Sequence, residues 1–180
     1  GGKTLQLAAA GAETAALDAS AARLARVQAN LARTGLSATL IEADALAWRP
    51  AEPAPAVLLD APCSALGTLR RHPEATLIRD GADLDAFTAL QDRLLDAAWE
   101  MVAPGGWLVF CTCSPLKAEG EERVAALRAR RPDAAPDPIG PKEIGDGALI
   151  REGALRALPS HWAETGGLDG FFAARLRKAS

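Results

Sequence analysis

Short apolar segments alternate with longer amphipathic ones along most of the chain, and this order constrains the fold more than any other feature. We expect helices at residues 3–10, 19–34, 83–101 and 121–130, and strands at 13–17, 38–41, 56–59, 107–112 and 171–176. Within 19–34, Leu24, Val27 and Leu31 recur at helical spacing, and Gly35 follows as the C-cap. The alternation predicts an α/β fold with a mostly parallel sheet and helices on both faces.

Two further segments contribute less regular structure. Pro104–Gly106 is expected to turn the chain before the strand 107–112. Residues 131–152 are rich in proline and glycine and are expected to form a loop. The run Ala56–Leu59 is continuously apolar, as is typical of a strand buried on both faces.

The composition limits the class of protein. With 180 residues and 49% hydrophobic content, the chain suits a single domain, 1–180. A net charge of −3 argues against a globally basic nucleic-acid binder but leaves room for a local basic patch. Three cysteines give no even disulfide set and fit a reducing, cytoplasmic location. No apolar run is long enough to predict a membrane span.

Functional side chains recur where the expected strands end. Asp18, Asp44, Asp60 and Cys113 each lie at or just after the end of a strand. Ligands of open α/β sheets bind beyond the carboxyl ends of the strands, so these positions predict a site. Any one of the acids alone is equally well explained as a solvated helix cap, and it is the series that indicates a site.

The opening GGKT permits two interpretations. It could be the end of a Walker A loop, with AVLLD as the magnesium-binding strand of a P-loop NTPase. It could also be a glycine turn for S-adenosylmethionine, in which Gly1 and Gly2 allow close backbone approach and Lys3 serves the methionine carboxylate. In that interpretation Asp18 accepts hydrogen bonds from the ribose hydroxyls and Asp44 receives the adenine amino group.

Two cysteines follow neighbouring expected strands, in DAPCS and in CTCSP. Adjacent parallel strands lie about 4.8 Å apart, so Cys63 and Cys113 can converge on one pocket beside Asp60. Thiolate addition to C6 of cytosine activates C5 toward an electrophilic methyl group, and a nearby acid assists as charge develops on the ring. A redox pair is the alternative. Cys111 lies within the strand and is assigned no chemistry, and the cysteines and histidines do not assemble a closed zinc site.

With these motifs, the sequence resembles the RNA cytosine-5 methyltransferases of the Sun type. GGKT resembles the end of their cofactor loop, LDASAARLARVQANLARTGL their second motif, and EADAL the segment with the adenine-binding acid. DAPCSALGTLRRHPE and CTCSP match the two cysteine motifs, and GGLDGFFAARLRK resembles the terminal strand of the bacterial ribosomal-RNA members. The resemblance implies a Rossmann-like S-adenosylmethionine-dependent methyltransferase fold.

The resemblance also implies roles for individual residues. Cys113 is then the nucleophile, Cys63 assists product release, and Asp60 lines the pocket of the base and the cofactor. The cofactor S-adenosylmethionine is bound by the set Gly1, Gly2, Lys3, Asp18, Asp44 and Asp60, with no metal. The substrate is RNA, with small-subunit ribosomal RNA expected and a monomer as the working form.

Cations after the first cysteine motif are candidates for RNA contact. Arg70, Arg71 and Arg79 could flank a phosphate backbone, although a solvated loop explains them nearly as well. The chain begins inside a glycine turn, so we expect its first strand to be missing and the domain to be incomplete at its N-terminus. The stretch PLKAEGEE after the second cysteine motif departs from the family's proline-acid pattern. A P-loop NTPase and a non-catalytic RNA-binding fragment remain the alternatives.

Overall fold

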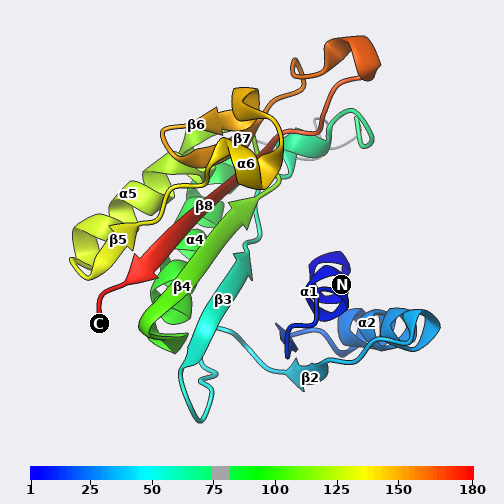
Figure 1. Ribbon diagram of the computed structural model, residues 1–180, viewed down its shortest axis with the longest axis vertical. Helices are drawn as coiled ribbons and strands as arrows, with labels where there is room; N and C mark the ends of the chain where they lie inside the picture. The colour runs from blue at the N-terminus through cyan, green and yellow to red at the C-terminus, as the bar shows by residue number, and fades with distance from the viewer. Residues whose placement is uncertain (74–81) are drawn as a thin grey trace. The chain divides into compact units, whose positions relative to one another are not determined.

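The computed structural model describes residues 1–73 and 82–180 of the chain (Figure 1). It divides into two compact units, Gly1–Arg49 and Pro50–Ser180, each with its own sheet. In the described residues, no helix combines the length and the apolar character that crossing a membrane requires.

The first unit is a small parallel αβ arrangement. Its elements are α1 (Gly2–Ala9), β1 (Ala15–Asp18), α2 (Ala21–Thr34) and β2 (Thr39–Glu42). Strands β1 and β2 pair in parallel, with Asp18 opposite Glu42. The Oγ of Ser20 accepts the backbone N–H of Arg23 at the start of α2, and Gly35 ends the helix at φ 67°. The expected helix stripe is confirmed, because Leu24, Val27 and Leu31 are all buried.

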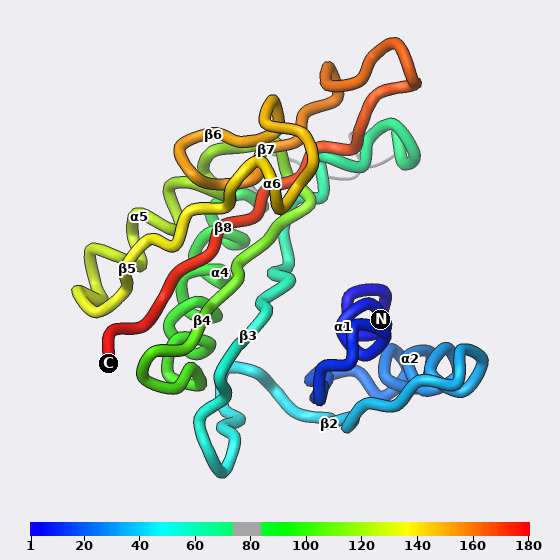
Figure 2. Tube along the Cα trace, viewed as in Figure 1, coloured from blue at the N-terminus to red at the C-terminus, as the bar shows by residue number. Residues whose placement is uncertain are grey.

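The second unit is built on a six-stranded sheet in the order β3-β4-β8-β7-β6, with β5 also paired to β8. Figure 2 shows β8 returning alongside β4 toward the C-terminus. The strands are β3 (Ala54–Asp60), β4 (Val102–Thr112), β5 (Ala134–Pro136), β6 (Ile150–Arg151), β7 (Ala154–Ala157) and β8 (Phe171–Lys178). The longer helices are α4 (Ala82–Met101) and α5 (Glu121–Arg130), and α6 (Pro141–Ile144) is a single short turn.

The α/β fold class is confirmed, but the sheet is mixed rather than mostly parallel. Strands β3 and β4 are parallel, whereas β8 is antiparallel to β4, β5 and β7, and β6 is antiparallel to β7. The apolar composition of a strand does not encode its direction. Parallel neighbours need a crossover connection, usually a helix, whereas the connection from β7 to its antiparallel neighbour β8 contains only the short turn η4 (Ala163–Thr165).

Three local expectations were also wrong. Leu58 is 38% exposed rather than buried, because β3 is the edge strand of its sheet. Pro104–Gly106 lies inside β4, where the register against β3 shifts, instead of ending a loop before the strand. The segment 131–152 contains β5, α6 and β6, which are too short to produce a periodic sequence signal.

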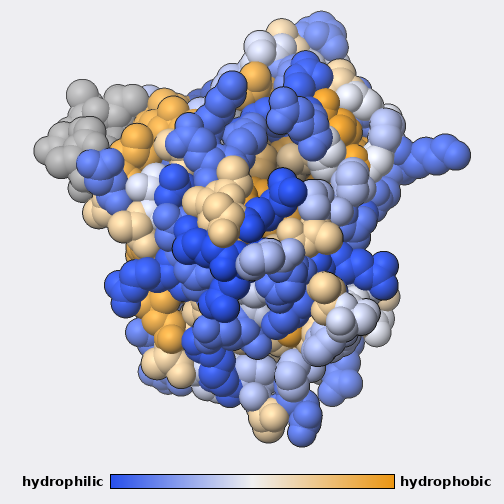
Figure 3. Space-filling view, turned by 90° about the vertical axis from the view of Figure 1, so that its left-hand side faces the viewer, coloured by the Kyte–Doolittle hydropathy of each residue, from blue (hydrophilic) through white to orange (hydrophobic). Residues whose placement is uncertain are grey.

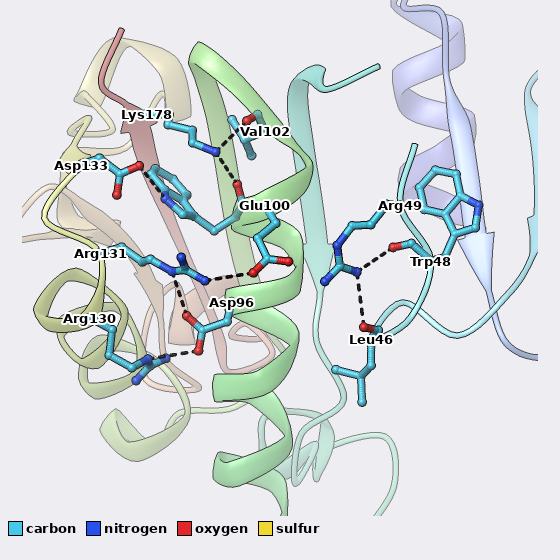
Figure 4. A network of polar contacts seen from close by, with 11 residues as sticks. Leu46, Trp48, Arg49, Asp96, Glu100, Val102, Arg130, Arg131, Asp133 and Lys178 are labelled. Atoms are coloured by element: carbon cyan, nitrogen blue, oxygen red, sulfur yellow. Dashed lines mark hydrogen bonds and ion pairs between the residues drawn. The ribbon is translucent and has the colours of Figure 1, made fainter. Parts of the chain in front are cut away.

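The core of the second unit lies between α4, α5 and the sheet. Trp99, Phe110 and Phe172 are almost fully buried there, and the two phenylalanine rings meet edge to face at 6.2 Å. Polar contacts at the edge of this core join α4 and the start of β4 to residues from α5 and β8 (Figure 4). Arg131 donates to Asp96 and Glu100, and Lys178 donates to the Val102 carbonyl at 2.9 Å.

The surface over α5 is mostly hydrophilic, with small apolar patches between the polar side chains (Figure 3). Glu122, Arg128 and Arg130 are exposed on this helix. Figure 4 also shows a local contact of the first unit, in which the Arg49 guanidinium donates to the backbone carbonyls of Leu46 and Trp48.

Candidate functional site: a thiol pair at the sheet edge

The two cysteine loops meet at the carboxyl ends of β3 and β4. These strands run parallel with Asp60 opposite Cys111, and the Ala61 N–H donates to the Cys111 carbonyl at 3.0 Å. Because parallel neighbours end at the same edge, the loops that follow them start side by side. The sulfurs of Cys63 and Cys113 lie 3.3 Å apart, within hydrogen-bond contact. The predicted convergence of the two thiols is confirmed.

The two thiols have different surroundings. Cys63 is 7% exposed, whereas Cys113 is only partly buried. The hydrogen bond with Cys113, followed by burial, raises the pKa of the Cys63 thiol well above its ordinary value. Cys63 therefore keeps its proton, and its S–H group can donate a hydrogen bond to the Cys113 sulfur. Cys113 is the more accessible of the two thiols to an incoming ligand.

Asp60 lies at the same edge and contacts the third cysteine. The Cys111 thiol donates to Asp60 Oδ1 over 3.6 Å, and Cys111 itself is 2% exposed within β4. This agrees with the interpretation of Cys111 as a buried structural residue. The predicted role of Asp60 toward a base or a cofactor stays a prediction.

A close approach of two glycines fixes the loop of Cys113. The Gly67 N–H donates to the Cys113 carbonyl at 3.0 Å, and the Gly170 N–H donates to the Gly67 carbonyl at 2.8 Å. A Cβ at Gly67 would stand 1.9 Å from the Gly170 oxygen, so only glycine fits. This contact explains the glycine in GTLRR and the last glycine in GGLDG, which sequence reasoning did not connect.

A buried arginine also reaches this loop and was missed. Arg156 is 5% exposed, donates to the Ser114 carbonyl at 2.9 Å and lies over the Phe172 ring at 4.6 Å. Its guanidinium forms a two-point contact with the Glu121 carboxylate. The segment around Arg156 was not recognised as a strand, so no sequence signal marked this arginine as buried. Glu119 is a second buried charged residue that sequence reasoning missed.

The predicted cofactor residues Gly1, Gly2, Lys3, Asp18 and Asp44 all belong to the first unit. Gly1 caps α1, and a Cβ there would approach Val27 Cγ2 to 2.7 Å. Gly2 and Lys3 follow in the first turn, where the backbone N–H groups of a helix have no acceptor within the helix itself.

The two acids of the first unit have structural partners as well. Asp18 accepts the Ser20 N–H and the Arg23 guanidinium, which lowers the pKa of the carboxyl, mainly through the Arg23 hydrogen bond. Asp44 accepts the Leu46 N–H at 2.9 Å in an exposed turn. Both acids therefore accept a local backbone N–H, and their part in cofactor binding stays a prediction.

Two of the candidate RNA-contacting arginines, Arg70 and Arg71, connect two loops of the second unit that lie side by side in Figure 2. Arg70 donates to the Gly166 carbonyl, and Arg71 forms an ion pair with Asp169. The side chain of Arg71 is 64% exposed, which leaves much of its guanidinium accessible. Arg79 lies outside the described residues. In the ranges 1–73 and 82–180, no cluster of three or more His, Cys, Asp or Glu residues could hold a metal ion.

Comparison with known proteins identifies the family. Residues 1–177 match the family model described as 16S rRNA methyltransferase RsmB/F. The chain belongs to the RsmB/F family. It is 41% identical over 186 residues to ribosomal RNA small subunit methyltransferase B of Pseudomonas putida, covering 99% of this chain and 40% of that protein. It is 45% identical over 166 residues to the protein of the same name from Xylella fastidiosa, covering 91% of this chain and 37% of the relative.

Solved structures agree with a methyltransferase fold. NSun6 from Pyrococcus horikoshii, solved with SFG, matches with a TM-score of 0.82 and 29% identity over 100% of this chain and 46% of that one. A methyltransferase homologue from the same organism matches with a TM-score of 0.69 and 27% identity, covering 92% and 53%. The chain thus has the methyltransferase fold, and it spans 40% or less of the length of the two curated relatives.

Proposed function

We propose that this chain is the catalytic domain of an S-adenosylmethionine-dependent enzyme that methylates C5 of a cytosine in RNA. The substrate class is small-subunit ribosomal RNA, as the names of the relatives suggest. The observation that carries the proposal is the 3.3 Å separation of the Cys63 and Cys113 sulfurs at the carboxyl end of a parallel strand pair. The proposed enzyme acts in the cytoplasm, with a monomer as the active form.

The first unit fits the cofactor chemically. The N-terminus of α1, with Gly1, Gly2 and Lys3, offers backbone donors and a cation to a carboxylate. Asp18 keeps acceptor capacity on Oδ2, which receives only the Arg23 Nε among its described hydrogen bonds, and Asp44 offers a second acceptor. Asp60, the remaining candidate, belongs to the second unit. When bound, S-adenosylmethionine supplies an electrophilic methyl group.

Cys113 begins the reaction as a thiolate. Its sulfur forms a bond to C6 of the cytosine, and the C5–C6 double bond is converted to a nucleophilic centre at C5. The hydrogen bond from the Cys63 thiol stabilises the Cys113 thiolate before the attack. The partial exposure of Cys113 is the access route for the base. The base must be unpaired or flipped out to reach the thiol.

Cys63 acts in the release step. After methylation, solvent water takes the proton from C5, the C–H electron pair restores the C5–C6 double bond, and the C6–S bond breaks to return the Cys113 thiolate. Cys63, held 3.3 Å from that sulfur, assists this elimination. Arg71 and Arg70, at the edge of the same loop cluster, contact the RNA backbone, and Arg79 does so from the same segment of the sequence.

The proposal is tested by transfer of a labelled methyl group from S-adenosylmethionine to small-subunit ribosomal RNA by the intact protein. Digestion of the RNA is expected to yield labelled 5-methylcytidine. Thermal stabilisation by S-adenosylhomocysteine, and not by ATP with magnesium, is expected in parallel. Stabilisation by ATP alone would instead support a P-loop NTPase. RNA binding without any transfer would support a non-catalytic RNA-binding protein.

A further inference from the structure

A carboxylate with no access to solvent lies beneath the two cysteine loops. Glu119, the last residue of the turn η2 (Lys117–Glu119), is 0% exposed. Its Oε1 accepts the Ser64 N–H at 2.7 Å and the Gln91 side-chain amide at 3.1 Å, and its Oε2 accepts the Ser64 hydroxyl at 2.5 Å. Among the described residues these partners are neutral groups. A buried acid without a cation is costly, so its hydrogen bonds must serve a purpose that an apolar residue could not.

These hydrogen bonds bracket Cys63. Ser64, the residue after Cys63, gives Glu119 both its backbone N–H and its hydroxyl. Pro62, the residue before Cys63, has its carbonyl bound at 2.9 Å by the same Gln91 amide that donates to Glu119. The backbone is therefore tied on both sides of Cys63 to one buried carboxylate and its amide partner.

The same residue reaches the flanks of Cys113. The Thr112 hydroxyl donates to the backbone carbonyl of Glu119 at 3.0 Å. The Ser114 hydroxyl contacts the Ser64 hydroxyl at 3.4 Å, which links it to the Glu119 carboxylate through one intermediate. Thr112 and Ser114 are both 0% exposed. Both cysteine motifs thus place a buried hydroxyl beside the thiol, and the two hydroxyl networks meet at Glu119.

We propose that Glu119 is a positioning residue that holds the loops of Cys63 and Cys113 in register, so that the two sulfurs meet across one bound base. The inference rests on the proposed function for the roles of the two thiols. Glu119 touches neither sulfur in the described contacts and acts through Ser64, Gln91 and Thr112. Its negative charge also contributes to the raised pKa of Cys63, after the hydrogen bond with Cys113, burial and the charge of Cys113.

The test compares Glu119→Gln with Glu122→Gln in the intact protein. Glu122 is exposed in the first turn of α5 and serves as the matched control. The first readout needs neither RNA nor cofactor: the rate at which iodoacetamide alkylates Cys63 at pH 8, followed by peptide mass spectrometry. Glutamine keeps one acceptor oxygen but replaces the other with an amide NH2, which weakens the hydrogen bonding to Ser64 and loosens the loop. Loss of the negative charge also favours the Cys63 thiolate, so we expect alkylation about 10-fold faster in Glu119→Gln. The control is expected to match the wild type.

The second readout is methyl transfer. We expect Glu119→Gln to lower kcat about 100-fold, because a displacement of about 1 Å at the reacting atoms has that effect, while the Kd of S-adenosylhomocysteine stays unchanged. Ser64→Ala keeps the Glu119 charge and removes the hydroxyl link, so it is expected to lower kcat with a smaller rise in Cys63 alkylation. Ser114→Ala removes the contact between the two hydroxyls, together with the hydrogen bond that the Leu116 N–H donates to Ser114 Oγ, and provides the same test if Glu119→Gln does not fold.

A folded Glu119→Gln protein that melts at a lower temperature but retains wild-type kcat and a protected Cys63 would overturn the inference and reduce Glu119 to a scaffold residue. Wild-type kcat in both Ser64→Ala and Ser114→Ala would overturn it as well. A wild-type protein that transfers no methyl group would instead contradict the proposed function. Cys63 alkylation still decides in that case whether Glu119 orders the thiol loop.

Discussion

The contact between Gly67 and Gly170 gives the sharpest prediction about the nucleophile loop. In Gly67→Ala, the new Cβ would lie 1.9 Å from the Gly170 oxygen and 2.7 Å from the Cys113 oxygen. One of these backbone segments must move by about 1.5 Å to reach an ordinary contact. Both hydrogen bonds of Gly67 are then strained. Overpacking and the two weakened hydrogen bonds together should lower the free energy of unfolding by about 2–6 kcal/mol.

The same displacement should affect activity more than binding. A shift of about 1 Å in the Cys113 loop is expected to lower methyl transfer about 100-fold. Urea unfolding and single-turnover transfer measure the two effects. Gly140→Ala is the matched control, because its Cβ would meet only Glu143 Oε1 at 3.6 Å and its φ of −94° suits alanine. A Gly67→Ala protein with wild-type stability and transfer rate would refute the reasoning.

Three further predictions test other parts of the molecule. The folded protein keeps the Cys63 proton while the unfolded thiol loses it near its ordinary pKa of about 8.5, so the free energy of unfolding should fall by about 1.4 kcal/mol per pH unit above that value. In Cys63→Ala, urea unfolding between pH 8 and 10 should show a smaller decrease in the free energy of unfolding with pH. The same decrease as in the wild type would contradict a protonated Cys63 in the folded protein. Arg156→Met removes the ion pair between the buried Arg156 and Glu121, whose side chain is 33% exposed, and should lower the free energy of unfolding in urea by about 2–3 kcal/mol. Arg151→Met, at the exposed position of β6, should change it little. Asp18→Asn should raise the Kd of S-adenosylhomocysteine in calorimetry about 10-fold, with the exposed Glu13→Gln unaffected, and equal affinities would remove Asp18 from the cofactor site.

The sequence was informative where local chemistry and topology agree. The amphipathic helix α2 was predicted from periodicity, and the strands β3 and β4 from their short apolar runs. Helix α2 and strand β3 lie close to the expected bounds, whereas β4 begins at Val102 instead of residue 107. The meeting of Cys63 and Cys113 followed from one rule, that parallel neighbouring strands end at the same edge. This contact between residues far apart in the sequence was predictable because the parallel pairing of β3 and β4 places both loops at the same edge of the sheet.

Other features depend on contacts that no local pattern contains. Strands β5, β6 and β7 are short and lie in sequence rich in proline and glycine, so neither they nor the antiparallel direction of β8 could be predicted. Glu119 and Arg156 are charged and look like surface residues in the sequence. Their burial depends on partners far along the chain, Ser64 for Glu119 and Ser114 for Arg156.

The central claim is that the two sulfurs act in sequence on one cytosine, and trapping of a covalent complex tests it most directly. The intact protein is incubated with substrate RNA and S-adenosylmethionine, denatured, and analysed for an RNA–protein adduct by electrophoresis and mass spectrometry. We predict that Cys63→Ala accumulates an adduct attached through Cys113, and that Cys113→Ala forms none and transfers no methyl group. An adduct retained in Cys113→Ala and lost in Cys63→Ala would contradict the account and reverse the two roles.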